Sequence, residues 1–410
     1  MLAKLKSVVV SFSVISLLTV ALFVLLNVVC GMLSRAFPTL MLTRSEKITR
    51  DFNMQFGARN AGQLAKWLAI SDPAEVQGFL AEAGRQYLTG LAYEDFTHFR
   101  LPVFKGKFIN FTEAGFRETK NQGPWPPSPD YYNVFFFGGS TTMGIGPDWA
   151  TIASYFQERL ERQPMASKQV KVYNFGRASY FSTQERILFQ QLLLDGRIPD
   201  LAVFIDGIND FVFGHPNGFE RWARVFDTSS FGRWRAWLQE QVPWLPLVQA
   251  AAVVADRFSS NTQVNLPTYQ PVTVPRDQLE AIIHRYLENK RQIEGVAKVY
   301  GIEAVFVWQP TPGYNYDLQY HAALNPVYGL GANERSGQGY ALMAQRKDSG
   351  GLGENFLWLG DMQAARKEPL YLDTVHYTAD FSRDIANEIV DFMRRRSHTT
   401  QRAGNVSLGP

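Results

Sequence analysis

The chain has 410 residues, of which 46% are hydrophobic and 19% charged, and its formal net charge is +3. This length and composition are typical of a folded protein of two or three structural units, and they argue against disorder, collagen and coiled coil. The 41 Lys and Arg nearly balance the 38 Asp and Glu. Nucleic acid is therefore not expected as a partner, because binding a polyanion requires a clustered basic excess. The single cysteine excludes a disulfide framework and a Cys-rich zinc module.

The chain begins with an uncharged, mostly apolar run at residues 7–34. About 20 apolar residues span a bilayer, so residues 1–34 are predicted to form a cytoplasmic stub and a transmembrane anchor. A cleaved signal peptide is the alternative, but its apolar part is normally about 7–15 residues long and ends at a small-residue cleavage site. Cys30 follows Val29 rather than a small residue, which disfavours a lipoprotein attachment site.

The orientation of this segment is less clear than its insertion. Lysines precede it and arginines follow it, so the basic residues at its two ends do not decide the matter. A short basic start followed by an apolar run favours a signal-anchor with its N-terminus in the cytoplasm. We therefore expect a single-pass protein of the cell membrane whose main domain is external, or periplasmic.

Residues 35–130 are predicted to form a leader, or accessory region, packed on the main domain. Leu64, Trp67 and Leu68 have helical spacing, and the Pro-rich segment QGPWPPSPD at 122–130 punctuates the end of the region. A loosely attached stalk is the alternative.

Residues 131–396 alternate between strand and helix patterns. Continuous apolar runs, typical of parallel strands buried on both faces, occur at 132–137, 171–175, 201–205 and 303–308. Helices are expected between and after them, at 149–160, 183–194, 275–300 and 380–393. This alternation predicts an α/β fold in which helices cover both faces of a parallel sheet.

Three segments depart from this pattern. An insertion at about 211–274 carries four tryptophans among arginines; it could be a lid, a sugar-stacking surface or a bilayer-facing patch, but we favour a helical hairpin that buries its tryptophans. Gly329 to Gly353 is rich in Gly and polar residues and is predicted to be a mobile surface loop. Residues 397–410 are predicted to be a disordered tail.

Candidate chemistry follows the first three strands. Ser140 comes directly after the first strand in GGSTT, at the edge of the sheet where open α/β folds bind ligands, and is a candidate nucleophile. A phosphate-binding loop is disfavoured because no Lys follows the glycines. Asn209 follows the third strand and could donate to an oxyanion, although Asn and Asp also cap helices and make turns. Asn174 and Gly176, after the second strand, have the same two interpretations.

Near the C-terminus, Asp373 and His376 are three residues apart in YLDTVHYT. This spacing can place the carboxylate against the imidazole, where it fixes the tautomer and stabilises the protonated ring. Of the six histidines, His376 alone combines a nearby upstream Asp with a position just before the final helix. It is therefore the candidate general base.

Together these four segments resemble the SGNH hydrolases, or GDSL-type esterases and lipases, in their order along the chain. The resemblance implies a flavodoxin-like three-layer sandwich with a parallel sheet, plus the N-terminal transmembrane helix and the helical insertion. It implies a catalytic Ser140, His376 and Asp373, and an oxyanion hole of Ser140, Gly176 and Asn209, without metal or cofactor. The segment around Ser140 departs from the pattern of the family, because Gly139 stands where Asp is usual. Residues that bind the rest of the substrate are not identified.

Three functions follow from this resemblance. The first is an esterase that removes acyl groups, such as acetyl, from an envelope glycan or lipid through an acyl-enzyme. The second is an O-acyltransferase of an exported polysaccharide, in which a sugar hydroxyl replaces water. The third is a catalytically silent glycan-binding protein, which the presence of Ser140, Asn209 and His376 disfavours. The sequence does not distinguish the first two, and the oligomeric state is not predicted.

Overall fold

The computed structural model describes residues 2–36, 56, 60–89, 91–213, 242, 245–251, 274–324 and 329–406. The chain forms two compact units, of which the first comprises residues 1–51 and 224–265 and the second residues 52–223 and 266–410. The greater part of the predicted insertion at 211–274 lies outside the described residues.

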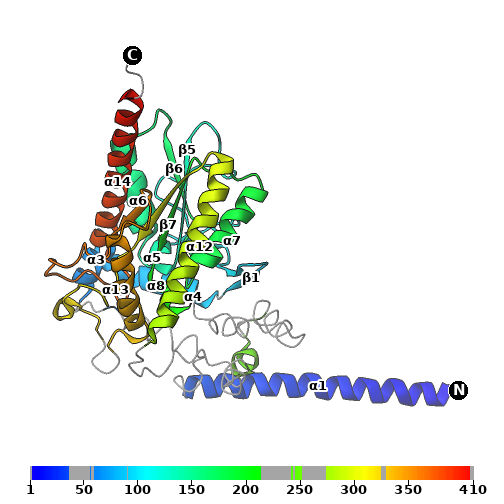
Figure 1. The fold of residues 1–410 in the computed structure, drawn as a ribbon. Coiled ribbons are helices and arrows are strands. Elements are labelled where there is room, and N and C mark those ends of the chain that lie inside the picture. The colour runs from blue at the N-terminus through cyan, green and yellow to red at the C-terminus, as the bar shows by residue number, and fades with distance from the viewer. Residues whose placement is uncertain are drawn as a thin grey trace. The chain divides into compact units, whose positions relative to one another are not determined.

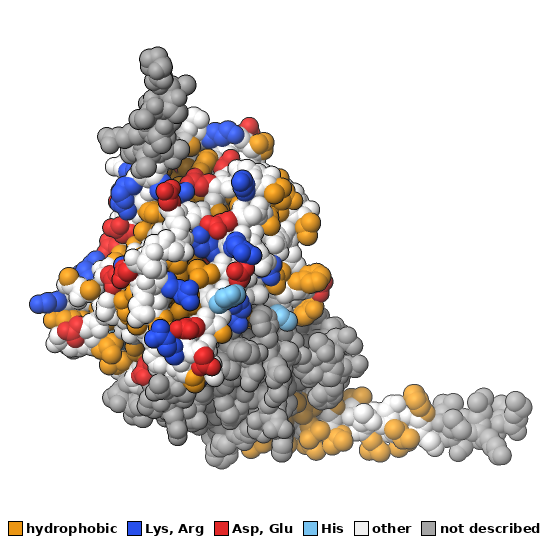
Figure 2. Space-filling view, viewed as in Figure 1, with side chains coloured by type: hydrophobic (Ala, Val, Ile, Leu, Met, Phe, Trp, Pro, Cys, Tyr) orange, Lys and Arg blue, Asp and Glu red, His pale blue; other side chains and the backbone are white. Residues whose placement is uncertain are grey.

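The first unit is built on helix α1 (Leu2–Ala36). Its segment Ser11–Ala36 has a mean hydropathy of 2.6 and, within the part of the chain that is described, is the one helix long and apolar enough to cross a membrane; a signal sequence has the same properties. Figure 2 shows hydrophobic side chains along this helix. Residues 246–251 are also helical, and the Leu247 N–H donates to Asn27 Oδ1 over 3.1 Å.

The second unit contains a five-stranded parallel sheet with the order β6-β5-β7-β8-β9. The strands are β5 (Tyr132–Gly138), β6 (Val170–Asn174), β7 (Leu201–Asp206), β8 (Glu303–Trp308) and β9 (Phe356–Trp358). The first strand therefore lies between the second and the third, which is the flavodoxin-like order. In register, Phe136 is opposite Asn174, and Asp206 is opposite Trp308. The predicted α/β fold is confirmed.

Helices cover both faces of this sheet (Figure 1). On one face, α6 (Ile152–Arg162) and α14 (Ala379–Val406) pack on a largely aliphatic core that includes Val134, Val203 and Val305. On the other face lie α7 (Ser182–Leu194) and α12 (Arg276–Tyr300). There the strands present aromatic rings, such as Phe137 and Phe204, which stack with centroids 4.8 Å apart. Alternation along each strand thus divides the core into two layers.

The ends of the elements follow local sequence rules. Helix α12 begins after Pro275 and ends at Gly301, whose φ of 69° is a left-handed conformation that glycine adopts readily. Two short helices follow strands at the carboxyl edge of the sheet: α5 (Ser140–Met143) and α8 (Ile208–Val212). The 3-10 turns are η1 (Pro73–Glu75), η2 (Asp148–Ala150), η4 (Leu318–Tyr320) and η5 (Gly331–Asn333).

One expectation about a loop is wrong. The segment 329–353 is not a mobile loop, because it contains helix α13 (Glu334–Asp348), whose Tyr340 and Met343 are fully buried. Tyr340 packs on Trp308, so tertiary contacts stabilise a helix rich in Gly and Ser. Helix α14 extends to Val406, and the predicted disorder of residues 397–410 stays a prediction. Ion pairs on the exposed face of α14 include the one between Arg396 and Glu303, whose charged atoms are 3.0 Å apart.

The described part of the leader packs on the sheet domain. It comprises helices α3 (Ala61–Leu68) and α4 (Val76–Leu88) and two hairpins, β1 (Ala92–Glu94) with β2 (His98–Arg100) and β3 (Phe104–Lys105) with β4 (Asn110–Phe111). Its apolar side chains share one buried cluster with Met143 of α5 and with Leu372, which lies one residue before Asp373. The leader therefore contacts two of the segments that carry candidate catalytic residues.

Candidate active site

Three strands deliver the candidate residues to one edge of the sheet. Because β5, β6 and β7 are parallel neighbours, the residues that follow them meet at their shared carboxyl edge. Ser140 is the first residue of α5, and its hydroxyl-bearing side chain is partly exposed. As the first residue of a helix, Ser140 has a backbone N–H without an intrahelical acceptor, so this group is free to serve as an oxyanion donor.

Asn209 is placed by the turn that follows β7. Gly207 makes this turn with a φ of 123°, which L residues rarely adopt, and a side chain there would collide with Tyr340 and Trp308. The Asn209 amide donates to the Tyr180 carbonyl over 2.8 Å. The same amide nitrogen lies so close to Gly139 that a Cβ at position 139 would collide with it. One N–H of Asn209 thus anchors the side chain next to Gly139, the residue before Ser140.

Gly176 also lies against the nucleophile helix, since a Cβ there would collide with the backbone of Thr142 and Met143. Its N–H donates to Asn174 Oδ1 over 3.0 Å, and the Asn174 amide donates to the Thr142 carbonyl over 3.0 Å. The structure therefore places Gly176 next to α5. To serve as an oxyanion donor, its N–H would have to be shared with Asn174 or released from it.

Asp373 and His376 form a close pair. Nδ1 of His376 is 2.7 Å from Asp373 Oδ2, and Asp373 Oδ1 accepts the N–H groups of Val375 and His376. Burial raises the pKa of the Asp373 carboxyl, but the His376 ring and these N–H groups outweigh burial and lower this pKa below its ordinary value. The carboxylate is thus ionised and fixes the imidazole with Nδ1 protonated, which leaves Nε2 as the basic nitrogen.

The imidazole is not hydrogen-bonded to Ser140 in this structure. His376 Nε2 is buried and has no hydrogen-bond partner among the described residues. The two segments are nevertheless connected by Gln309, which follows β8. Its Oε1 accepts the Thr141 hydroxyl over 2.6 Å. The Tyr377 hydroxyl shares its proton between Gln309 Oε1 at 3.0 Å and the Pro310 carbonyl at 2.7 Å. Thr141 and Tyr377 are the residues directly after Ser140 and His376. An orphaned ring nitrogen beside the nucleophile helix is the group that a serine hydroxyl or a substrate would satisfy.

The sequence motifs indicated neither Gln309 nor Arg117, a residue of the leader that also contacts the site. Arg117 is 1% exposed, and its Nε donates to Asp148 over 2.8 Å. Its Nη atoms donate to the carbonyls of Met143, Gly144 and Gly146 in the loop after α5. Its backbone N–H donates to the Asn174 carbonyl. One leader residue therefore connects the end of α5, through its side chain, with the end of β6, through its backbone.

A cluster of buried acids lies behind the Asn209 turn. Glu185, Asp206 and Asp210 are at most 4% exposed. Burial raises the pKa of each, and the charge of Asp210 raises that of the other two further. Ser182 donates to Asp210 over 2.6 Å, and the Glu185 carboxyl, when protonated, donates to the carboxylate of Asp206. This cluster of acids lies behind the turn that places Asn209, and we assign it no part in the candidate chemistry at the edge of the sheet.

Comparisons with known proteins identify structural similarity only. No family model matches the chain, and no curated protein matches it. Similar solved structures include a gut microbial diltiazem-metabolizing enzyme (11% identity, TM-score 0.37, 67% of this chain and 48% of that one). Others are a lipolytic protein of the G-D-S-L family from Desulfitobacterium hafniense (12%, 0.33, 64% and 99%) and an acetylxylan esterase from Geobacillus stearothermophilus (14%, 0.34, 64% and 93%).

The chain spans about half the length of the diltiazem-metabolizing enzyme and nearly all of the other two. These TM-scores are below 0.5, so nothing is argued from them. The similarity to a known family rests instead on the strand order and on the four motifs at the carboxyl edge of the sheet. In both respects the chain is similar to the GDSL-type, or SGNH, esterases.

Proposed function

We propose that the chain is a serine ester hydrolase that uses Ser140, His376 and Asp373. The observation that carries this proposal is the Asp373–His376 pair, whose carboxylate fixes Nδ1 while Nε2 is buried and unpartnered beside the nucleophile helix. A buried basic nitrogen without a hydrogen-bond partner costs folding stability. A role as the general base would account for its being kept.

The proposed reaction has two steps. Nε2 of His376 takes the Ser140 proton as Oγ bonds to the ester carbonyl carbon, and the same proton is given to the departing alcohol when the carbon–oxygen bond breaks. Water then attacks the acyl-enzyme, releases the carboxylic acid and restores Ser140. The Ser140 N–H, the Asn209 amide and the Gly176 N–H would donate to the oxyanion, and loss of one donor typically costs about 10²–10³-fold in turnover.

We further propose that the enzyme is held at the membrane by α1, with the catalytic unit outside the cytoplasm, and that it acts on acylated glycans or lipids of the envelope. The contact between Asn27 and Leu247 supports retention of α1. If α1 were removed as a signal sequence, the residues around 247 would lose this partner.

The test uses the full-length chain in detergent micelles with 4-nitrophenyl acetate. Ser140→Ala and His376→Gln are expected to lower turnover by about 10³-fold or more. Ser167→Ala and His284→Gln, at exposed positions, are the matched controls and should retain full activity. Equal rates for wild type and Ser140→Ala would refute the serine mechanism. With an oligosaccharide added, acetylated sugar in place of free acetate would assign the transferase reaction to the same residues.

A further inference from the structure

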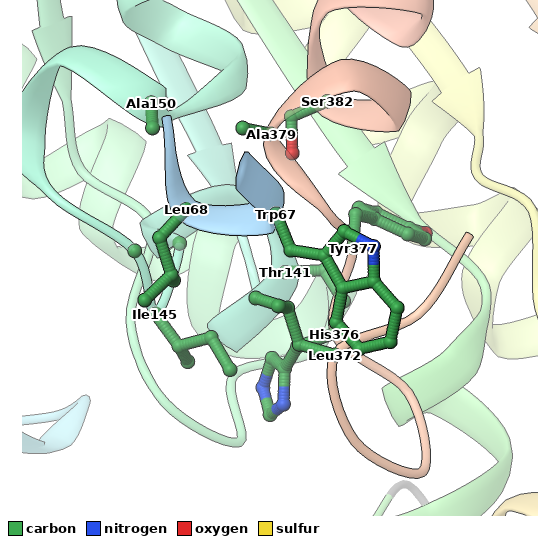
Figure 3. A pocket seen from close by; sticks show the side chains of 12 residues that line it. Trp67, Leu68, Thr141, Ile145, Ala150, Leu372, His376, Tyr377, Ala379 and Ser382 are labelled. Carbon is green, nitrogen blue, oxygen red and sulfur yellow. The ribbon is translucent and has the colours of Figure 1, made fainter. Parts of the chain in front are cut away.

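The leader contacts the edge of the sheet that carries the candidate site at two places. At the first, Trp67 and Leu68 of α3 line a small cavity together with His376, and Figure 3 shows these side chains around it. At the second, the hairpin of β1 and β2 contacts residues 176–180, which follow β6 and are called the Gly176 loop below. This second contact is made by charged and polar groups that the sequence motifs did not indicate.

The Gly176 loop affects more than one candidate oxyanion donor. Besides carrying Gly176, it accepts the Asn209 amide through the Tyr180 carbonyl over 2.8 Å. The Arg177 N–H donates to the carbonyl of Gly138, the last residue of β5, over 2.9 Å. The orientations of the Gly176 N–H and of the Asn209 side chain therefore depend on where this one loop lies.

The backbone of the Gly176 loop is strained at one residue. Ser179 has a φ of 63°, a left-handed conformation that serine adopts rarely. Such a conformation persists only where the surrounding structure holds it. Contacts from outside the loop are therefore needed to keep its geometry.

The side chain of Arg177 supplies such a contact. Arg177 is 1% exposed, and its Nη1 and Nη2 atoms donate to the two carboxylate oxygens of Glu94 in β1. This two-pronged geometry makes guanidinium–carboxylate pairs strong and directional. Nη1 also donates to the Tyr180 hydroxyl over 2.8 Å, and that hydroxyl donates to the Phe99 carbonyl in β2. These bonds fix the loop to the leader hairpin at positions 177 and 180.

We propose that Arg177, held by Glu94, is a positioning residue that aligns the candidate oxyanion donors, so that the leader hairpin is required for turnover and not only for folding. The inference rests on the proposed serine esterase. Arg177 would act through Gly176 and Asn209 and not on the substrate itself, because its charged group bonds to the leader. Loss of alignment should weaken interactions made only in the transition state, which lowers kcat and leaves KM nearly unchanged.

The test removes the charge of Glu94 and keeps the shape of its side chain. Glu94→Gln, in the full chain in detergent micelles with 4-nitrophenyl acetate, should lower kcat about tenfold and change KM by less than about twofold.

Glu294→Gln is the matched control. Glu294 also accepts a buried cation, Lys290, and its side chain is 35% exposed against 23% for Glu94. It accepts Asn355 as well, which lies at the amino end of β9 and so at the opposite edge of the sheet from the site. Glu294→Gln should lose comparable stability and no turnover.

A transition-state analogue provides a readout that a general loss of stability would not change. When trifluoroacetone binds, its carbonyl carbon bonds to Ser140 Oγ, the hydroxyl proton passes to His376 Nε2, and the negative charge stays on the former ketone oxygen. Glu94→Gln should raise the inhibition constant of trifluoroacetone by the same factor of about ten by which it lowers kcat. Glu294→Gln should leave this inhibition constant unchanged.

Tyr180→Phe is the second variant, for the case in which Glu94→Gln does not fold. It keeps the buried ring and removes the hydroxyl that lies between Arg177 Nη1 and the Phe99 carbonyl. We expect kcat and the affinity for trifluoroacetone to fall together by roughly threefold.

The outcomes separate the two proposals. Suppose that hydrolysis depends on Ser140, but the folded variants Glu94→Gln and Tyr180→Phe keep the kcat of wild type, lose kcat without a matching loss of affinity for trifluoroacetone, or lose no more than Glu294→Gln. Arg177 then has no positioning role, and the esterase stands. If Ser140→Ala matches wild type, the esterase proposal fails and the role of Arg177 fails with it.

Discussion

At the residue scale, the pair formed by Asp373 and His376 makes the sharpest prediction. Asp373→Asn keeps the shape of the side chain but removes the charge that stabilises the protonated ring and selects its tautomer. We expect kcat to fall about 10³–10⁴-fold with a small change in KM, measured with a short-chain ester. Asp195→Asn, at an exposed position on the same domain, should be indistinguishable from wild type. A loss below tenfold for Asp373→Asn would show that the carboxylate does not orient His376.

The buried acids predict a stability effect that depends on pH. The pKa of Glu185 is raised in the folded chain by burial, then by the charges of Asp206 and Asp210. The native state therefore binds more protons than the unfolded state, so this group's contribution to stability is complete below the ordinary carboxyl pKa and is lost as pH rises towards the raised value.

Glu185→Gln removes the titrating carboxyl and with it the loss of folding stability as the pH rises. The variant should be more stable than wild type at pH 8 by about 1–3 kcal/mol and equal to it near pH 4, as measured by thermal unfolding at both values. Glu354→Gln, at an exposed position, is the control. An equal or lower melting temperature for Glu185→Gln at pH 8 would contradict the raised pKa of this buried carboxyl.

At the scale of elements, the connection through Gln309 links the nucleophile helix to the segment that carries His376. Tyr377→Phe removes the hydroxyl that lies between Gln309 Oε1 and the Pro310 carbonyl and leaves the ring in place. We expect kcat to fall about tenfold with KM changed little, because the two segments lose a shared hydrogen bond and their alignment loosens. Unfolding should become easier by only about 1 kcal/mol.

The matched control for this change is Tyr155→Phe. Tyr155 is also buried, but its hydroxyl is paired with Arg383 on the face where α6 and α14 pack. It should lose comparable stability and no turnover. If both variants lose turnover equally, the effect of Tyr377 is general destabilisation and the connection through Gln309 has no role in catalysis.

Elements could be predicted where local pattern and tertiary packing agree. The four long strands are continuous apolar runs because each is buried on both faces, and α12 has a proline at its start and a glycine at its end. Helix α13 was missed because only a few of its residues are apolar and its helical state depends on the burial of Tyr340 and Met343. Strand β9, three residues long, has too little sequence to show a pattern.

The same division applies to the site. Ser140, Asn209 and the Asp373–His376 pair lie in short local motifs, so the sequence indicates them. Gln309 and Arg117 act through contacts between residues far apart in the chain, such as the bond from Thr141 to Gln309 across 168 positions. No local pattern marks a Gln after a strand or an Arg in an isolated β-bridge as a positioning residue, and only the fold brings them to the site.

At the scale of the whole molecule, helix α1 predicts where in the cell the protein is found. If it is a retained anchor, the protein in cells should stay in the membrane pellet after alkaline carbonate extraction, and its N-terminal peptide should begin at Met1 or Leu2. A protease added outside the inner membrane should digest the catalytic unit. Release into the soluble fraction with an N-terminus near residue 35 would instead identify α1 as a cleaved signal sequence.

The charge on the surface of the second unit bears on which ligands it attracts. On the visible face, acidic and basic side chains are interspersed without a large patch of one sign (Figure 2). Such a surface does not favour polyanions, in agreement with the near balance of charges in the sequence. Specificity must then come from the site at the edge of the sheet, where the leader, the strands and the His376 segment meet.

The most direct measurement is covalent labelling of the nucleophile. The full-length chain is treated with a fluorophosphonate, which bonds to an activated serine and releases fluoride, and the labelled peptide is identified by mass spectrometry. We predict one adduct on Ser140, absent from Ser140→Ala and formed at least about 100-fold more slowly in His376→Gln. Labelling that is absent, or that proceeds equally in Ser140→Ala, would contradict the serine mechanism.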